Sequence, residues 1–282
     1  KAFVARGLED FSISRLKEKM SWGIPVPGDD TQVMYVWFDA LANYISTLGW
    51  PENTQHFTHF WVEGTPTQYC GKDNTRFQAL TWQAMLIAAG LPNSYQIVVN
   101  GFITAEGGVR MSKTLGNVVD PLAIANEYGT DALRFFLLKE VSSFEDSPFT
   151  LERFRESYNA HLANGLGNLT SRILTLSEKY CQPATTTDII DYQTITNFDI
   201  QQAMNSIWET IRMLDGQIQT EEAFKVIKID EELGKQMIQT YVRTLYLIAL
   251  SLKPFMPTTS QRILELIKEN KKPETPLFAR LS

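Results

Sequence analysis

A segment near the middle of the chain, residues 100–121, reads NGFITAEGGVRMSKTLGNVVDP and separates two types of sequence pattern. It overlaps the end of an apolar, β-branched run, residues 96–103 (QIVVNGFI), which predicts a strand with a turn at Asn100-Gly101. Beyond Pro121 the pattern changes, and almost every segment carries apolar residues at helical spacing. The stretch is therefore predicted to be a glycine-bearing loop that follows a strand and precedes a helical region.

Upstream of this loop, the sequence predicts a strand, a helix and a second strand. Residues 59–62 form a short apolar run that predicts the first strand, and Asp73 is placed to cap the helix that follows. Gly90 and Pro92 end that helix before the strand at residues 96–103. Such a unit is typical of a parallel sheet. There are too few strands for a complete doubly wound sheet, so we expect the chain to be a piece of a longer protein.

Downstream of the loop, apolar stripes predict a bundle of four amphipathic helices. Residues 122–126 and 131–140 are predicted to form shorter helices, and a domain boundary is expected at residues 147–150. The first stripe comprises Phe154, Tyr158, Leu162, Leu166, Leu169, Ile173 and Leu176, and the second comprises Ile200, Met204, Ile207, Ile211, Leu214 and Ile218. The third comprises Leu233, Met237, Tyr241, Leu245, Ile248 and Leu252, and the fourth comprises Ile263, Leu264 and Ile267.

The composition excludes several classes of protein. With 44% hydrophobic and 21% charged residues, the 282-residue chain has the balance of a globular protein, and no apolar run approaches the ~20 residues that span a bilayer. Two cysteines and three histidines exclude a disulfide framework and a four-cysteine zinc site, so we expect no metal site and no zinc in this chain. A net charge of −6 argues against binding nucleic acid by bulk charge but leaves room for a local basic patch.

The start of the chain bears on location. Its first residues lack the apolar core of a signal peptide, and cysteine is scarce, so a cytoplasmic location is predicted. A mitochondrial location stays open, because a transit peptide would lie upstream of residue 1. The sequence indicates no membrane partner and no oligomeric state.

Residues 110–114 (RMSKT) resemble the KMSKS signature of class I aminoacyl-tRNA synthetases, and the flanking residues Gly101-Phe102, 115–117 (LGN) and Pro121 match as well. These enzymes activate an amino acid at the α-phosphate of ATP, and negative charge builds on the departing pyrophosphate. A lysine on a mobile loop can stabilise that charge. The resemblance implies catalytic roles for Arg110, Ser112 and Lys113, with Met111 and Lys113 also contacting ATP.

Three further segments resemble the methionyl-tRNA synthetases: residues 10–27 (DFSISRLKEKMSWGIPVP), 36–41 (VWFDAL) and 71–78 (GKDNTRFQ). The resemblance implies ATP contacts from Gly71 and Asp73, at a strand end of the kind where open α/β sheets bind nucleotides. It implies methionine contacts from Arg15, Trp37, Ala40, Leu41, Tyr44, Asn74, Phe77, Gln78 and Trp82.

Three glutamines depart from the family pattern. Gln78 stands where bacterial relatives usually have histidine, near the sulfur of the substrate. Gln68 replaces a common upstream histidine, and Gln83 replaces a usual proline. A glutamine can donate and accept hydrogen bonds but cannot become cationic. These changes bear on how methionine is recognised, not on the family.

The helical region adds an independent resemblance. Residues 165–172 (GLGNLTSR) resemble the start of the anticodon-binding bundle of the methionyl enzymes, and Asn168 and Arg172 share a helix face. By that resemblance both residues contact anticodon bases, and Phe224 stacks on a base where the family has tryptophan. If the resemblance is set aside, the default interpretation is that Asn168 and Arg172 lie on a solvent-exposed face of a helix. Trp208 is expected in the core.

Together these residues predict an α/β fold followed by an all-α one. The resemblance implies the C-terminal part of a Rossmann-type catalytic domain at residues 1–117, a stem-contact segment at 118–149 and an anticodon-binding bundle at 150–282. The implied activity is ATP- and Mg²⁺-dependent activation of L-methionine and its transfer to tRNA(Met). No HIGH-like tetrapeptide occurs, so the chain alone is expected to be inactive.

Two alternatives stay open at this point, and a third is disfavoured. Another class I synthetase, for valine, isoleucine or leucine, would share the loop but is expected to carry a different anticodon domain. A non-catalytic tRNA-binding module derived from a synthetase would keep the bundle without the reaction. An α/β nucleotide-binding protein unrelated to tRNA would leave the matches in the bundle unexplained.

Overall fold

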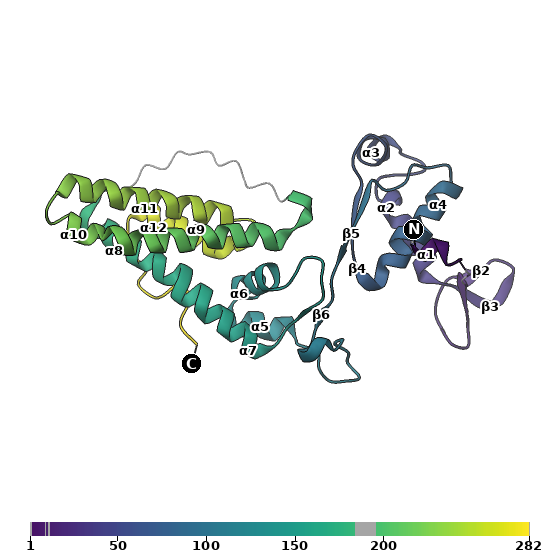
Figure 1. Cartoon of the computed structure of the whole chain (residues 1–282). Coiled ribbons are helices and arrows are strands. Elements are labelled where there is room, and N and C mark those ends of the chain that lie inside the picture. The colour runs from purple at the N-terminus through teal and green to yellow at the C-terminus, as the bar shows by residue number, and fades with distance from the viewer. Residues whose placement is uncertain (1, 9, 11, 184–195, 282) are drawn as a thin grey trace. The chain divides into compact units, whose positions relative to one another are not determined.

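The computed structural model describes residues 2–8, 10, 12–183 and 196–281. The chain divides into two compact units, Lys1–Asn100 and Gly101–Ser282 (Figure 1). This division does not coincide with the boundaries expected at residues 117 and 147–150. The functional division into catalytic, stem-contact and anticodon-binding parts stays a prediction.

The first unit mixes short strands and helices. Its elements are α1 (Ala2–Ala5), β1 (Ser14–Leu16), β2 (Pro25–Val26), β3 (Asp29–Met34), α2 (Val36–Ser46), α3 (Gln55–Phe57), a π-helical turn (Thr58–Val62), β4 (Thr67–Gly71), a 3₁₀ turn (Lys72–Asn74), a π-helical turn (Phe77–Thr81), α4 (Trp82–Ala88) and β5 (Gln96–Asn100). The β1, β2 and β3 strands form an antiparallel sheet with β3 in the middle. The β4 and β5 strands pair in parallel from Thr67 opposite Gln96 to Gly71 opposite Asn100. The predicted strand–helix–strand unit is therefore present.

Two local predictions in this unit are wrong. Residues 59–62 are helical, because Phe57 and Trp61, one helical turn apart, are both buried in a small core with Leu41 and Trp82. The first strand of the parallel pair is β4 instead. Asp73 does not cap its helix, because Gly71 occupies the cap position and Asp73 lies inside the first turn.

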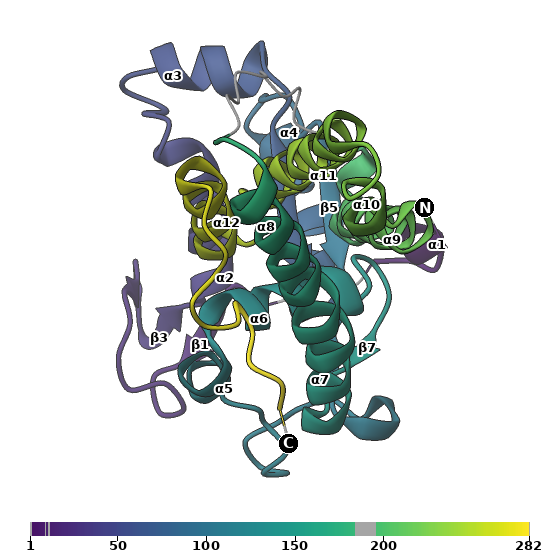
Figure 2. The ribbon, with the colours of Figure 1, turned by 90° about the vertical axis from the view of Figure 1, so that its left-hand side faces the viewer.

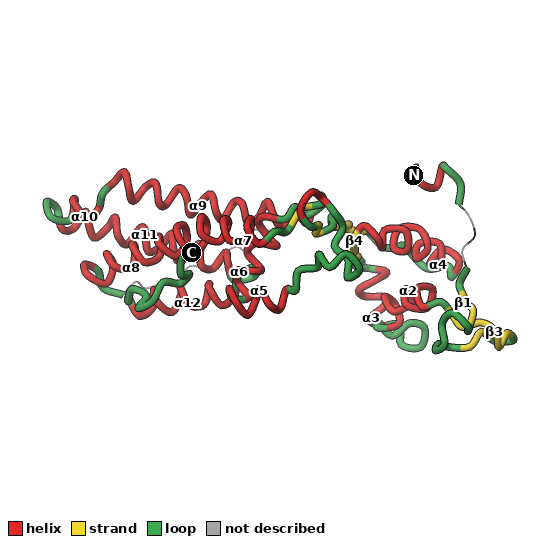
Figure 3. Tube along the Cα trace, turned by 90° about the horizontal axis from the view of Figure 1, so that it is seen from below, coloured by secondary structure: helices red, strands yellow, loops and turns green. Residues whose placement is uncertain are grey.

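The second unit is nearly all helix (Figure 3). It begins with β6 (Ile103–Thr104), which pairs in parallel with β7 (Ser147–Pro148). The helical elements are a 3₁₀ turn (Glu106–Gly108), α5 (Pro121–Tyr128), α6 (Thr130–Phe135), a π-helical turn (Phe136–Glu140), α7 (Leu151–Ser157), a π-helical stretch (Tyr158–Gly167), α8 (Asn168–Tyr180), a 3₁₀ turn (Thr196–Phe198), α9 (Ile200–Glu221), α10 (Ala223–Val226), α11 (Glu231–Leu252) and α12 (Pro257–Glu269). Helix α11 packs against α8, α9 and α12 (Figure 2).

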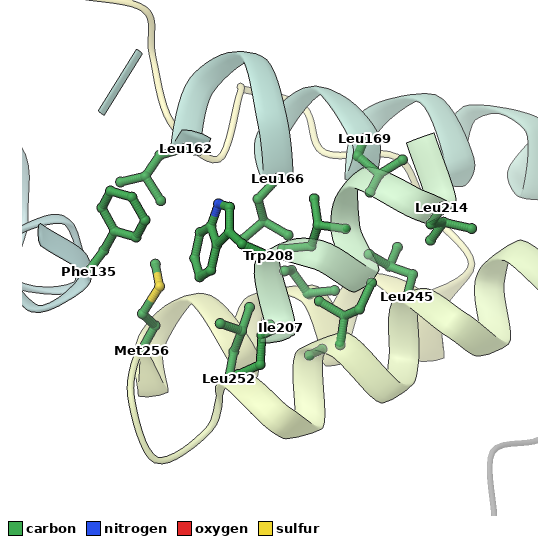
Figure 4. Packing of buried hydrophobic residues seen from close by; sticks show 14 of the residues in the cluster. Phe135, Leu162, Leu166, Leu169, Ile207, Trp208, Leu214, Leu245, Leu252 and Met256 are labelled. Carbon is green, nitrogen blue, oxygen red and sulfur yellow. The ribbon is translucent and has the colours of Figure 1, made fainter. Parts of the chain in front are cut away.

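One apolar core holds the second unit together (Figure 4). The predicted stripes supply most of it, and Trp208 lies among Phe135, Leu162 and Leu166, as expected of a core residue. Leu233 is the exception, because it lies in the first turn of α11 and is 48% exposed. Apolar residues of 118–149 join the same core, among them Ile124, Phe135, Phe136 and Phe149. Shared burial explains why no division falls at residues 147–150.

Two negative findings concern only the part of the chain that the structure describes. No helix there is both long enough and apolar enough to cross a bilayer. No three histidine, cysteine, aspartate or glutamate side chains gather there to hold a metal ion.

Candidate functional site

Aromatic side chains from α2 and from the helix after β4 meet in the first unit. The rings of Trp37 and Phe77 stack with their centroids 4.9 Å apart and their planes 9° apart. Tyr44 and Trp82 lie with ring centroids 6.0 Å apart, and Leu41 is buried beside them. Five of the predicted methionine-contacting residues therefore belong to one pair of packed helical segments. Aromatic and aliphatic groups of this kind suit a polarisable thioether.

Gln78, the sixth of these residues, is buried, and both ends of its side-chain amide form hydrogen bonds. It lies in the π-helical turn and is 3% exposed. Its Nε2 donates to the Tyr44 hydroxyl oxygen at 2.8 Å, and its Oε1 accepts from Gln68 Nε2 at 3.0 Å. The amide that replaces the usual histidine is thus held in place on both sides.

Three residues that sequence reasoning did not assign to the site support Gln78. Gln68 Oε1 accepts from the Ser94 hydroxyl at 2.6 Å. Gln83 Nε2 donates to the Gln78 carbonyl oxygen at 2.9 Å and to Ser94 Oγ at 3.1 Å. Gln68 and Gln83 were visible in the sequence as departures from the family, but no sequence signal pointed to Ser94.

Arg15, Ala40 and Asn74 complete the predicted methionine contacts. Arg15 lies on β1, where its guanidinium carbon is 3.7 Å from the Tyr35 ring centroid and its Nη1 donates to the Ser14 carbonyl at 2.8 Å. Ala40 is exposed on α2, and Asn74 ends the 3₁₀ turn after β4. These three residues lie on other elements or faces than the stacked rings, and their contact with methionine stays a prediction.

Gly71 and Asp73 lie together at the carboxyl end of β4. A Cβ built on Gly71 would come within 2.9 Å of Asp73 Oδ1, so a side chain at residue 71 would displace that carboxylate. Burial, and then the negative charge of Asp73, raise the pKa of the neighbouring Cys70 thiol. The end of the strand therefore combines an open backbone with a carboxylate, which suits hydrogen bonds from ribose hydroxyls.

In the second unit, the RMSKT loop is held at its two ends and open at its tip. Asn117 Oδ1 accepts from the Ser112 N–H at 2.8 Å, and the Ser112 hydroxyl accepts from the Leu115 N–H at 3.2 Å. Met111 packs against the apolar core, and the Arg110 guanidinium carbon is 5.0 Å from the Phe102 ring centroid.

Lys113 occupies the tip of this loop. It is exposed, and within the described ranges it forms no ion pair with a carboxylate. Its carbonyl oxygen accepts from the Gly116 N–H at 3.2 Å, where Gly116 has φ = +64°. The loop thus presents an ammonium group on a tight turn whose backbone favours glycine.

The predicted anticodon contacts fall into two settings. Asn168 lines a cavity of about 320 Å³ together with Asn164, Ser171 and Arg280. Arg172, one turn further along α8, forms an ion pair with Asp215 of α9. The two side chains therefore start on one helix but have different partners, and Arg172 reaches a nucleic-acid base only if it shares its guanidinium with Asp215.

Phe224 lies near the end of the bundle, on the short helix α10. It is 42% exposed, and the Lys225 ammonium is 5.8 Å from the ring centroid. Glu222, which joins α9 to α10, has φ = +46° and pairs with Lys225. An exposed ring beside a cation has the chemistry of a stacking platform for a base.

A family model described as tRNA synthetases class I (M) matches residues 1–174. The chain belongs to this methionyl family of class I tRNA synthetases. The fold class predicted from the sequence, an α/β part followed by helices, is that of the family.

Individual relatives of the methionyl family agree with this. The methionine–tRNA ligase of Mesorhizobium japonicum is 34% identical over 94% of this chain, and that of Clostridium acetobutylicum is 35% identical over 93%. The ligase of Thermosynechococcus vestitus is 45% identical over 64% of the chain. The chain spans 54%, 43% and 34% of these three proteins, so it corresponds to about half or less of their length.

Solved structures of the family give the same result. The structure of Mycobacterium tuberculosis methionyl-tRNA synthetase in complex with methionyl-adenylate has a TM-score of 0.82 and 28% identity to this chain. It covers 99% of this chain, which in turn covers 62% of that protein. A second methionyl-adenylate complex of the same enzyme has a TM-score of 0.80 at 31% identity.

Proposed function

We propose that the protein activates L-methionine with ATP and transfers it to tRNA(Met). The observation that carries the proposal is the joint presence of the Trp37–Phe77 stack, the Tyr44–Gln78 hydrogen bond and the exposed Lys113 in a chain of the methionyl family. A solved relative holds methionyl-adenylate, the product of such an activation step. The site of action would be the cytoplasm, where translation takes place.

Methionine would bind among the aromatic residues of the first unit. Its thioether would contact the rings of Trp37 and Phe77, and the Tyr44 hydroxyl would donate a hydrogen bond to the sulfur. Shape alone separates apolar side chains weakly, so a polar contact to sulfur would add discrimination against hydrocarbon side chains.

ATP would bind at the end of β4 and at the RMSKT loop. Asp73 would accept from the ribose hydroxyls, and Gly71 would leave room for the nucleotide. Lys113, supported by Arg110 and Ser112, would stabilise the charge that builds on pyrophosphate as the carboxylate of methionine attacks the α-phosphate. Mg²⁺ would come with the nucleotide, because this ion is usually bound through substrate phosphates.

The bundle would bind the tRNA. Asn168 and Arg172 on α8 would hydrogen-bond to anticodon bases, and Phe224 on α10 would stack on one of them. A chain that kept only this role would be a tRNA-binding module without the reaction. The aromatic cluster around Trp37 and Phe77 and the Lys113 loop favour the complete enzyme, since such a module needs neither.

The test is ATP–pyrophosphate exchange that depends on an added amino acid. The full-length protein from the upstream-extended reading frame is assayed with each standard amino acid, and the 282-residue chain serves as the control. We expect exchange with methionine alone, and none from the short chain. Exchange with another amino acid would refute the proposal that the aromatic residues of the first unit bind methionine. A lack of exchange from the full-length protein would favour a tRNA-binding module without the reaction.

A further inference from the structure

A chain of hydrogen bonds in the first unit runs from Gln83 through Ser94, Gln68 and Gln78 and ends at the Tyr44 hydroxyl. We call the four residues that lead to Tyr44 (Gln83, Ser94, Gln68 and Gln78) the amide relay. They come from α4, from the loop before β5, from β4 and from the π-helical turn. Residues far apart in sequence therefore converge on one phenol group.

The direction of the relay is fixed where it starts. The Ser94 backbone N–H can only donate, and it binds Gln83 Oε1 at 3.1 Å. The Gln78 backbone carbonyl can only accept, and it binds Gln83 Nε2 at 2.9 Å. These two backbone groups leave the Gln83 amide one orientation, with its Nε2 also donating to the Ser94 hydroxyl oxygen at 3.1 Å.

Each later bond follows from the one before it. Since its oxygen accepts from Gln83, the Ser94 hydroxyl gives its hydrogen to Gln68 Oε1. The Gln68 amide then presents Nε2 to Gln78 Oε1, and the Gln78 amide presents Nε2 to the Tyr44 oxygen. Gln68 and Gln78 are 4% and 3% exposed, so water cannot compensate for a reversed amide, and a buried unpaired group is costly.

The consequence falls on Tyr44. Its oxygen accepts from Gln78, and its hydroxyl hydrogen has no acceptor in the described part of the chain. We propose that Gln83, Ser94 and Gln68 are positioning residues that commit the Tyr44 hydroxyl to donate to the substrate side chain. This inference rests on the proposed function, which puts methionine beside Tyr44. A thioether accepts such a bond, whereas the methylene of norleucine, which replaces the sulfur, does not.

The test replaces Gln68 by methionine in the full-length protein. This change keeps the length of the side chain but removes the donor to Gln78. The Gln78 amide is then free to turn over, which places Oε1 where Nε2 now lies, 2.8 Å from the Tyr44 oxygen, and Oε1 accepts the hydroxyl hydrogen there. We expect the KM for methionine in pyrophosphate exchange to rise roughly threefold to tenfold. The kcat for methionine and the KM for norleucine should stay unchanged.

Two further variants separate this role from damage to the fold. Gln96→Met is the matched control, because Gln96 lies on the neighbouring strand β5 and donates to Thr67 Oγ1, outside the relay. In a Tyr44→Phe background, Gln68→Met should have no further effect on the KM for methionine. Equal rises of the KM for both amino acids, no rise for either, or a full effect without the Tyr44 hydroxyl would each overturn the inference. Failure of the proposed function would appear separately, as a wild-type protein that shows no exchange with methionine.

Discussion

The two compact units bury polar groups in different ways. In the second unit, two fully buried hydroxyls donate to the backbone: Thr170 to the Leu166 carbonyl at 2.8 Å, and Ser260 to the Ala249 carbonyl at 2.6 Å. In the first unit, the buried amides of Gln68 and Gln78 bond to each other and lead to Tyr44 in the aromatic cluster. A hydroxyl bonded to its backbone offers nothing to a ligand, whereas the relay ends on a donor. The buried core of the second unit is thus a scaffold, whereas the relay of the first unit leads to predicted methionine contacts.

The largest expected effect is on the apolar core of the second unit. Leu245 is fully buried on α11, so Leu245→Ala should lower the free energy of unfolding by about 2–5 kcal/mol. Chemical denaturation of the full-length protein, followed by circular dichroism, measures the change. Leu115→Ala is the matched control, because Leu115 is 65% exposed and its loss should cost less than about 0.5 kcal/mol. Similar effects for the two substitutions would show that this core is not closely packed.

The next effect is on the rate of the reaction and comes from Lys113, an exposed side chain outside the apolar core. Lys113→Ala should slow methionine-dependent pyrophosphate exchange about 100-fold to 1,000-fold, because the side chain stabilises charge only in the transition state. The KM for methionine should change little. Lys271→Ala, at another exposed lysine of the same unit, should leave the rate unchanged. Comparable exchange by the Lys113 and Lys271 variants would remove Lys113 from the mechanism.

A smaller effect is expected at the end of the bundle. Phe224→Ala should weaken tRNA(Met) binding by about 1–3 kcal/mol, the usual worth of one stacked base, with exchange unaffected. Filter binding or fluorescence anisotropy measures the affinity. The control is Ile229→Ala, since Ile229 is 90% exposed on the turn that follows α10 and has no aromatic face. If the two substitutions weaken binding equally, the ring has no special role.

The smallest effect tests the scaffold's one half-buried histidine. Burial, and then the charge of Lys139, lower the pKa of His161 below 6.5, although Glu140, whose Oε1 is 3.8 Å from His161 Nε2, raises it. The unfolded chain therefore takes up this proton at a higher pH than the folded one. The free energy of unfolding should fall as the pH drops through 6.5 toward the lowered pKa.

His161→Gln should flatten this part of the stability curve, measured by denaturation at pH 7 and pH 5. Burial is the largest single influence on the pKa of Glu140 and raises it, but the hydrogen bond to Lys139, the charge of Lys139, and contributions from Ser157 and His161 together lower the pKa below 4.5. That group therefore titrates outside this window. His56→Gln, at an exposed position, should leave the slope as it is. An unchanged slope in the His161 variant would show that another group causes it.

The sequence predicts the second unit better than the first, for a physical reason. Periodic burial leaves a trace in the sequence, so the stripes through Leu162, Met204 and Leu245 located the bundle, and only Leu233, in the first turn of its helix, is exposed. In the first unit, Phe57 and Trp61 are four residues apart and both buried, which is the spacing of a helix. The short apolar run at residues 59–62 favoured a strand instead, and the prediction followed that run. Short elements leave little room for a period to show.

The sequence indicated which residues belong to the candidate site, but it did not indicate which of them are joined by hydrogen bonds or ion pairs. The RMSKT motif identified Lys113 directly, and the aromatic segment identified Trp37 and Tyr44. The relay could not be read from the sequence, because Gln68 and Ser94 are 26 residues apart and meet only when β4 and β5 pair. The partner that Arg172 finds in Asp215 likewise depends on how α8 packs against α9.

The proposed roles of the two units are tested by aminoacylation of tRNA(Met) by the full-length protein, compared with the same transcript carrying a different anticodon. We expect methionine to be attached to the first transcript and charging of the second to fall roughly tenfold or more, with methionine-dependent exchange equal in both cases. That result would assign amino-acid selection to the first unit and tRNA selection to the second. Equal charging of both transcripts, or charging with another amino acid, would contradict it.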